Sequence, residues 1–168
     1  MTKKQLAFGG IVAAVVASVA GAALATPGSG TTGVVVARAA FPDQVNIKLS
    51  LKDDDRGRET VQVRNAEDNV MQQIIFAPDG HSGWHSHPGP AVILIKSGEL
   101  TFYQEEAGRC VSRTYSAGEA LIDSGQGHAH LAHNTSAGET EVWVTYFDVP
   151  AGGSPRIDVP AAPEACAS

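Results

Sequence analysis

The sequence predicts an all-β fold in a single domain, and three observations support this prediction. The chain has 168 residues, a length typical of one domain. Its 18 glycines and 9 prolines indicate many turns, while a hydrophobic content of 43% argues against a disordered chain. Short apolar or β-branched runs recur between the turns. Outside the N-terminal leader, no apolar stripe with the period of a helix competes with them.

Nine short runs have the length and composition of strands. Apolar and polar residues alternate most clearly over 45–51 and 60–64, as a half-buried strand requires. The expected strands are 34–37, 45–51, 60–63, 70–76, 91–95, 100–103, 111–115, 120–122 and 141–147. Nine strands of this length fit a β-sandwich or a β-barrel.

The first 25 residues have the features of a secretory signal peptide. Lys3 and Lys4 precede an uncharged stretch over 6–25, which ends in Ala-Leu-Ala as a signal-peptidase substrate does. We expect cleavage after Ala25, export of the mature chain and no stable membrane insertion after cleavage. The alternative is an uncleaved anchor, because an apolar stretch of this length is just sufficient to span a bilayer.

The remainder of the chain divides into three parts. Residues 26–33, rich in Gly, Ser, Thr and Pro, are predicted to form a flexible spacer, followed by a barrel domain over 34–150 and a Pro-rich tail over 151–168. Both cysteines, Cys110 and Cys166, lie in the part expected to be exported, where an oxidising compartment allows a disulfide. Such a bond would tether the tail to the barrel. Two free thiols are the alternative.

The charge balance excludes nucleic acid as a partner. Formal net charge is −6, and loss of Lys3 and Lys4 with the leader makes the mature chain more acidic still. No basic patch with interleaved aromatic residues is present, so the chain lacks the electrostatic footprint of a nucleic-acid-binding protein.

All six histidines lie in two short windows, 81–87 and 128–133. Each window contains a pair separated by one residue, His85 with His87 and His128 with His130. On a strand this spacing places both rings on one face, so two neighbouring strands can direct three or four imidazoles at one point. Neutral imidazole binds Zn, Fe, Cu or Ni, and the pattern therefore predicts a metal site. The alternative is a set of surface histidines on turns.

The two windows resemble the two motifs of the cupin superfamily, in the same order. In the first, a glycine, the His85-Ser86-His87 triplet and a closing Gly98 follow one another. In the second, Gly118 opens the motif, Gly127 precedes His130 by three residues, and Asn134 follows that histidine by four. The resemblance covers about residues 70–147.

This resemblance implies a single-domain, jelly-roll β-barrel of the cupin type. It also implies that His85, His87 and His130 are ligands of one divalent transition metal, which would be Fe, Mn, Zn, Cu or Ni. A homodimer is a further expectation, because cupins often pair through strand edges.

Two positions depart from the cupin pattern. Ala91 occupies the position of the usual glutamate ligand, and Gly125 stands where the second motif has proline. Three neutral histidines would leave the ion its full charge and more open positions, which would make it a stronger Lewis acid. His128 is a candidate replacement ligand if it shares a strand face with His130. The alternative for His128 is a pocket-lining role.

Other candidate residues surround the motifs. We expect His133 to point away from His130 on its strand, toward the surface, and His81 to lie at a turn. The aromatic side chains of the motif region either pack in the core or line a ligand pocket: Trp84, Phe102, Tyr103 and Tyr146. Glu99 and Glu119 are candidate general acids or bases, for which surface placement is the alternative.

Two classes of function fit these features. One is an exported metal-dependent enzyme, either an oxygenase or an isomerase or lyase, that acts on a small organic molecule. The other is a module that binds a small molecule or a metal without performing chemistry. The fold does not decide between them, since one barrel supports many activities.

Overall fold

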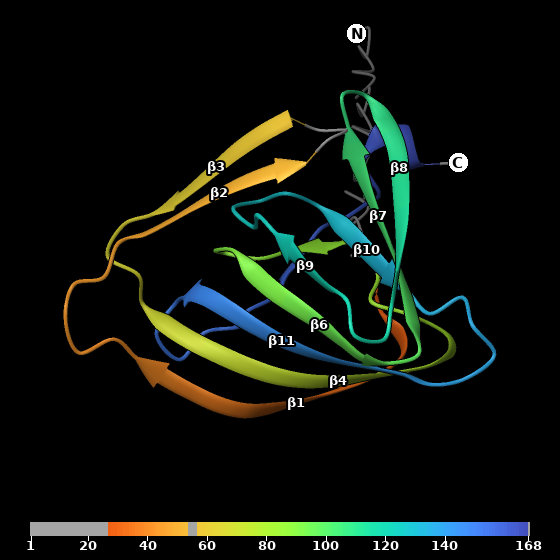
Figure 1. The fold of residues 1–168 in the computed structure, drawn as a ribbon, viewed down its shortest axis with the longest axis horizontal. Coiled ribbons are helices and arrows are strands. Elements are labelled where there is room, and N and C mark those ends of the chain that lie inside the picture. Colours follow the sequence, from red (N-terminus) through yellow and green to blue (C-terminus); the bar gives the residue numbers. More distant parts are fainter. Residues whose placement is uncertain (1–26, 54–56, 168) are drawn as a thin grey trace, which may run out of the picture.

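The computed structural model describes residues 27–53 and 57–167, so the predicted signal peptide lies outside the described residues. Within these ranges the chain forms 12 strands, all paired antiparallel, and one short 3-10 helix, η1 (Glu164–Cys166). Figure 1 shows two layers of strands facing one another, which confirms the predicted all-β barrel in a single domain. No helix in the described part is long and apolar enough to cross a membrane.

The first layer is a curved five-stranded sheet, seen in the lower half of Figure 1. Its strand order is β1-β4-β11-β6-β9. The strands are β1 (Ser29–Ala40), β4 (Asp68–His81), β11 (Thr140–Val149), β6 (Ala91–Ser97) and β9 (Ala120–Asp123). The inner face of β11 is regular, since every second residue from Thr140 to Tyr146 is buried.

The second layer has the strand order β8-β7-β10-β5-β12. Its strands are β8 (Arg109–Ser116), β7 (Glu99–Glu106), β10 (His130–His133), β5 (His85–Ser86) and β12 (Ile157–Asp158). In Figure 1 the long β7 and β8 rise from one end of the first sheet. The two layers are joined where β10 also pairs with the end of β4, with His133 opposite His81.

A hairpin of β2 (Ile47–Asp53) and β3 (Gly57–Val63) forms a separate two-stranded sheet. It projects from the end of the barrel at which β1 stops (Figure 1). Val61 and Val63 of β3 are each only 3% exposed, so this hairpin packs against the rest of the fold through one face.

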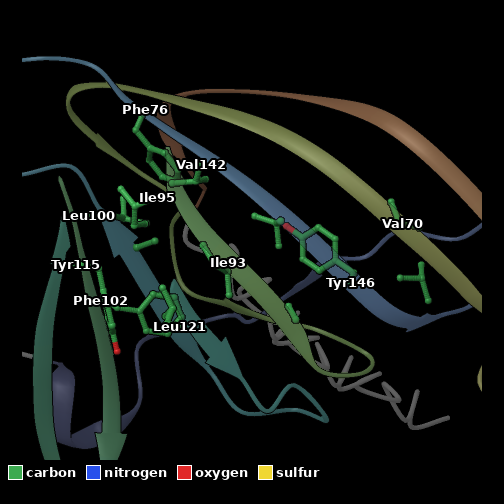
Figure 2. Close-up of a cluster of buried hydrophobic side chains, with 14 residues drawn as sticks. Val70, Phe76, Ile93, Ile95, Leu100, Phe102, Tyr115, Leu121, Val142 and Tyr146 are labelled. Atoms are coloured by element: carbon green, nitrogen blue, oxygen red, sulfur yellow. The ribbon is translucent and has the colours of Figure 1, made fainter. Parts of the chain in front are cut away.

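The hydrophobic core fills the space between the two layers. Figure 2 shows Ile93 and Ile95 of β6 beside Val142 of β11, with Leu100 and Phe102 of β7 on the other side. Each fully buried side chain of this size contributes about 1.5–3 kcal/mol to folding. The barrel therefore has an extensive apolar core of its own.

All nine predicted strands are present, and three very short ones were missed. The missed strands are β5, β10 and β12, with two, four and two residues. The predicted spacer over 26–33 is wrong for residues 29–33, which begin β1 and pair with β4. The register shifts at Gly30, whose φ is 64°: Ser29 pairs with His81, whereas Thr31 and Thr32 pair with Phe76 and Ile75.

The predicted disulfide between Cys110 and Cys166 is confirmed. It joins β8 to the helix η1, and so fastens the last residues of the tail to the second layer. The tail is less irregular than the sequence suggested, because β12 pairs with β5. The disulfide thus fastens a tail that contributes a strand, β12, to the barrel.

Removal of this disulfide should lower stability without abolishing the fold. A cross-link with a sequence separation of 56 stabilises by up to about 4 kcal/mol on the chain-entropy model. Cys110→Ser with Cys166→Ser should lower the free energy of unfolding in urea accordingly, and dithiothreitol should affect the wild type but not the variant. Equal stability of wild type and variant would contradict this role.

Candidate metal centre

Two short strands bring the predicted ligands together. His85 lies on β5 and His130 on β10, and the two residues are directly paired in the antiparallel ladder. His87 follows β5 with its side chain also in the interior. In the first window, the H-x-H spacing thus directs both imidazoles into the barrel, as predicted.

The three histidines His85, His87 and His130 form a tight cluster inside the barrel. One potential ligand nitrogen from each lies within 4.8 Å of the others. The ring centroids are 4.3–5.0 Å apart, and the residues are 7%, 3% and 1% exposed. Three imidazoles at this separation fit one transition-metal ion.

Backbone carbonyls fix the orientation of two of these rings. His85 Nδ1 donates to the Gly83 carbonyl at 3.0 Å, and His87 Nδ1 donates to the Pro155 carbonyl at 2.7 Å. With the proton held on Nδ1, the lone pair of Nε2 is free to bind an ion. The ring of His130 is stacked on Phe102, with centroids 4.4 Å apart. The ligand set is therefore oriented in advance.

Burial keeps the cluster in the neutral state that metal binding requires. It lowers the pKa of His85 to about 2, and the neighbouring His130, His87 and Arg156 add to this effect. Burial likewise lowers the pKa of His130 to about 4 and lowers the pKa of His87. At neutral pH none of the three rings competes for a proton with an incoming ion.

A buried carboxylate, Asp123 at the end of β9, lies beside the cluster. Its side chain is 1% exposed, and neither oxygen has a hydrogen-bond partner. Its nearest polar neighbours are His130 Nδ1 and His128 Nδ1, each 3.6 Å from Oδ1, and His87 Nε2, 3.9 Å from Oδ2. Burial raises the pKa of the Asp123 carboxyl, but the neighbouring histidines, His130 foremost, lower it to about 2.

An ionised carboxylate without hydrogen bonds in a protein interior is costly, by several kcal/mol. A cation placed among these side chains would offset that cost. The orphaned oxygens of Asp123 and the unpaired His130 Nδ1, together with the neutral donor set, therefore fit a divalent metal.

The proposed replacement ligand His128 is not part of the cluster, so this prediction is wrong in the observed geometry. The second window enters a strand only at His130, and His128 lies in the turn before it. The two rings consequently do not share a strand face. His128 instead turns its Nδ1 toward Asp123, which raises the pKa of the imidazole.

The remaining polar candidates lie away from the cluster. His133 points outward and pairs with Asp79 at 2.9 Å, as predicted. Glu99 and Glu119 are exposed, and Glu119 accepts a hydrogen bond from the Ser116 amide. Neither glutamate lines the cavity at the histidines.

Asn134 of the second motif has a structural role. It is fully buried, and its amide group donates to the carbonyls of Phe76, Ala77 and Gly138. These contacts hold the turn after β10 against the end of β4.

The glycine that replaces the proline of the second motif has a physical reason. Gly125 has a φ of 64°, whereas a proline ring fixes φ near −65°. Any Cβ at this position would also lie 1.9 Å from the Gly89 carbonyl oxygen. The close approach of these two loops therefore requires glycine at 125.

A cavity of about 290 Å³ opens beside the histidine cluster. Its walls are mainly apolar, with Ile93, Val142 and Val144 among them. Tyr146, whose ring lies 4.8 Å from that of His87, and Arg156 of the tail are its notable polar groups. The tail thus forms one wall of the cavity.

Sequence reasoning missed three contributors to this site: Asp123, Pro155 and Arg156. Pro155 acts through its backbone carbonyl, which leaves no side-chain signal. Asp123 is recognisable only from the pairing of β9 with β6, a contact between segments distant in sequence.

Stability of the metal-free protein should fall as pH falls from 6.5 to 5. The pKa of His85, His87 and His130 is lower in the folded chain than the value of 6.5 expected after unfolding. The unfolded chain therefore takes up protons first. His85 and His130 each contribute a loss of up to about 1.4 kcal/mol per pH unit below 6.5, and His87 adds a loss in the same direction. Urea unfolding in the presence of a chelator measures this slope.

The double variant His85→Gln with His87→Gln removes two of these groups and should flatten the slope. An unchanged slope in that variant would mean that other groups cause the acid sensitivity.

Comparison with known proteins gives matches among solved structures alone, since no family model and no curated protein matches the sequence. The chain is similar to the polyketide cyclase RemF from Streptomyces resistomycificus, with 16% identity, a TM-score of 0.49, and 84% of this chain and 79% of that chain covered. It is also similar to a cupin domain of an XRE family transcriptional regulator from Enterobacter cloacae, with 16% identity and a TM-score of 0.44 over 73% and 99% of the two chains.

An oxalate oxidase is 26% identical with a TM-score of 0.42, over 48% of this chain and 41% of that chain. The chain therefore spans less than half the length of this enzyme.

The resemblance to cupins depends on features of the chain itself. Both histidine windows have the order of the cupin motifs, an antiparallel barrel encloses them, and the three motif histidines converge in its interior. In these features the single-domain chain resembles the cupin superfamily.

Proposed function

We propose that this protein is an exported cupin that binds one divalent transition metal through His85, His87 and His130. The observation that carries this proposal is the convergence of three buried imidazoles within 4.8 Å. When bound, such an ion supplies a Lewis acid and, for iron, manganese or copper, a redox centre. Export is supported by the Cys110–Cys166 disulfide, since such bonds persist in oxidising compartments.

The cavity beside the cluster favours a small, largely apolar molecule that carries an anionic group. Its volume of about 290 Å³ and its aliphatic walls suit a compact organic ligand. Arg156, whose Nε donates to the Asp158 carboxylate, brings a positive charge to this cavity. That charge contributes to the lowered pKa of His85 and His87. A carboxylate or phenolate would be attracted to the same place.

Within this cavity a metal-dependent oxygenase or isomerase is our preferred function. The Tyr146 hydroxyl is one protein group that could orient a ligand beside His87. Burial raises the pKa of Tyr146, so the hydroxyl keeps its proton and can donate a hydrogen bond.

A non-catalytic binding module is the second candidate, and one observation favours it. No aspartate or glutamate is among the described residues that line this cavity. The cavity thus lacks a carboxylate to serve as general base, and binding without turnover would need none.

Purified protein should contain about one transition metal per chain by elemental analysis. His85→Ala combined with His87→Ala should abolish this metal content while the circular dichroism spectrum stays that of the wild type, because the buried hydrophobic residues of the core cluster are all retained. His133→Ala is the matched control, since this histidine points outward, and it should retain the metal. A wild type without metal after reconstitution would refute the proposed site.

Oxygen uptake distinguishes the two functions. The iron- or copper-loaded protein should consume oxygen with at least one member of a panel of phenols, thiols and flavonoids. Arg156→Gln should raise the KM for an anionic substrate about tenfold or more, because loss of a charge-assisted contact costs about 1.5–3 kcal/mol. Binding of a panel member by calorimetry without oxygen uptake would instead identify the protein as a binding module.

A further inference from the structure

We propose that Asp123 is a fourth ligand of the metal and supplies the carboxylate that the first motif lacks at Ala91. This inference rests on the metal centre proposed above, and it concerns a residue outside both histidine motifs.

The first argument is position. Ala91 on β6, where the cupin pattern has glutamate, is directly paired with Asp123 on β9. Side chains of directly opposed residues in an antiparallel pair point to the same face of the sheet, with Cβ atoms about 5 Å apart. Ala91 is fully buried, so the shared face is the barrel interior. A carboxylate lost on one strand is thus replaced by one on the adjacent strand at the same level.

The second argument is the state of the carboxylate. Asp123 is 3% exposed, and both of its oxygens lack a hydrogen bond. Buried carboxylates are normally satisfied by several donors or by a cation. The groups that surround this one are imidazoles, and three of them lie within 3.9 Å.

The third argument is the direction of the two oxygens. Oδ1 faces His130 Nδ1 and His128 Nδ1, each at 3.6 Å. Oδ2 faces His87 Nε2 at 3.9 Å, the nitrogen left free because His87 Nδ1 donates to Pro155. Two ligands of one ion at about 2.1 Å lie roughly 3–3.5 Å apart, so Oδ2 and Nε2 must approach by less than about 1 Å to share a coordination shell. Asp123 lies outside the group of ligand atoms that are all within 4.8 Å of one another, so the bound ion must also draw its side chain closer to the three-histidine cluster.

A carboxylate in the shell changes the chemistry expected of the centre. Three imidazoles and one aspartate leave a divalent ion with a net charge of +1, in place of the +2 of a purely histidine site. Such a centre would bind the ion more tightly than a site of three histidines alone. It would also be a weaker Lewis acid than that site.

The test uses chelator-treated full-length protein and Co²⁺ as the probe. The affinity for Co²⁺ is measured by calorimetry and the ligand field by visible absorption. Asp123→Asn keeps the shape but removes the charge, and should weaken Co²⁺ binding at least 100-fold and alter the absorption spectrum. His128→Gln is the matched control, because it removes the outer neighbour of the same carboxylate. It should stay within about threefold of the wild type with an unchanged spectrum.

The melting temperature of the metal-free variant provides a second readout. Because Asp123 makes no hydrogen bond, Asp123→Asn should fold and melt at or above the wild-type temperature without metal, and should lose the stabilisation that Co²⁺ gives the wild type. A lower melting temperature without metal, or failure to fold, would assign the carboxylate a structural role and overturn the proposal. An unaltered Co²⁺ spectrum would overturn it too, since a residue that only orients His130 leaves the ligand set intact.

A positional swap completes the test. Ala91→Glu with Asp123→Ala returns the carboxylate to the strand of the cupin pattern, and should recover Co²⁺ affinity to within about tenfold of the wild type. If the wild type itself binds no Co²⁺, the proposed function fails. If the wild type binds and Asp123→Asn matches it in affinity and spectrum, this inference alone fails.

Discussion

The site depends on one backbone pairing, that of His130 on β10 with His85 on β5. A strand of two residues has little cohesion of its own, and β5 is held on both sides, by β10 and by β12 of the tail. This double pairing determines where His85 and His87 enter the barrel. The hydrogen bonds to Gly83 and Pro155 then determine which nitrogen each ring presents. The geometry of the cluster is therefore a consequence of ladder register more than of side-chain packing.

The cluster and the core make opposite contributions to stability. Fourteen buried hydrophobic residues form the core cluster, and their burial drives folding. Three neutral histidines and an unpaired carboxylate occupy the same interior at a cost in free energy. A bound cation would offset the cost of burying these histidines and this carboxylate. Burial of the apolar core therefore offsets the cost of burying the polar groups of the site.

The sequence predicted the framework well and the details of the site in part. Alternation and turn residues were sufficient for the nine longer strands, because each of these strands has its own local pattern. β5, β10 and β12 were missed because two to four residues cannot display a period. The error at His128 has the same origin, since its role depended on a strand that begins only at His130.

The position of Asp123 beside the histidine cluster could not be predicted from a sequence motif, for a different reason. Its place opposite Ala91 is set by the pairing of β9 with β6, and a motif describes spacing along one segment. The spacer over 26–33 was misjudged because Gly30 and the threonines beside it suit a flexible linker and a bulged edge strand equally. Export and the homodimer stay predictions.

The histidine cluster depends on the C-terminal tail, and therefore forms late in the synthesis of the chain. Chains are synthesised from the N-terminus, so the Pro155 carbonyl that orients His87 and the β12 strand that holds β5 are made after both histidine windows. The cluster is therefore complete only after the segment of the tail that contains Pro155 and β12 has been made. Divalent transition metals bind a given set of ligands with affinities that follow a fixed order. Which metal a protein acquires therefore depends partly on the metals available where it folds. A metal ion bound by this cluster would therefore be acquired in the compartment in which the chain finishes folding.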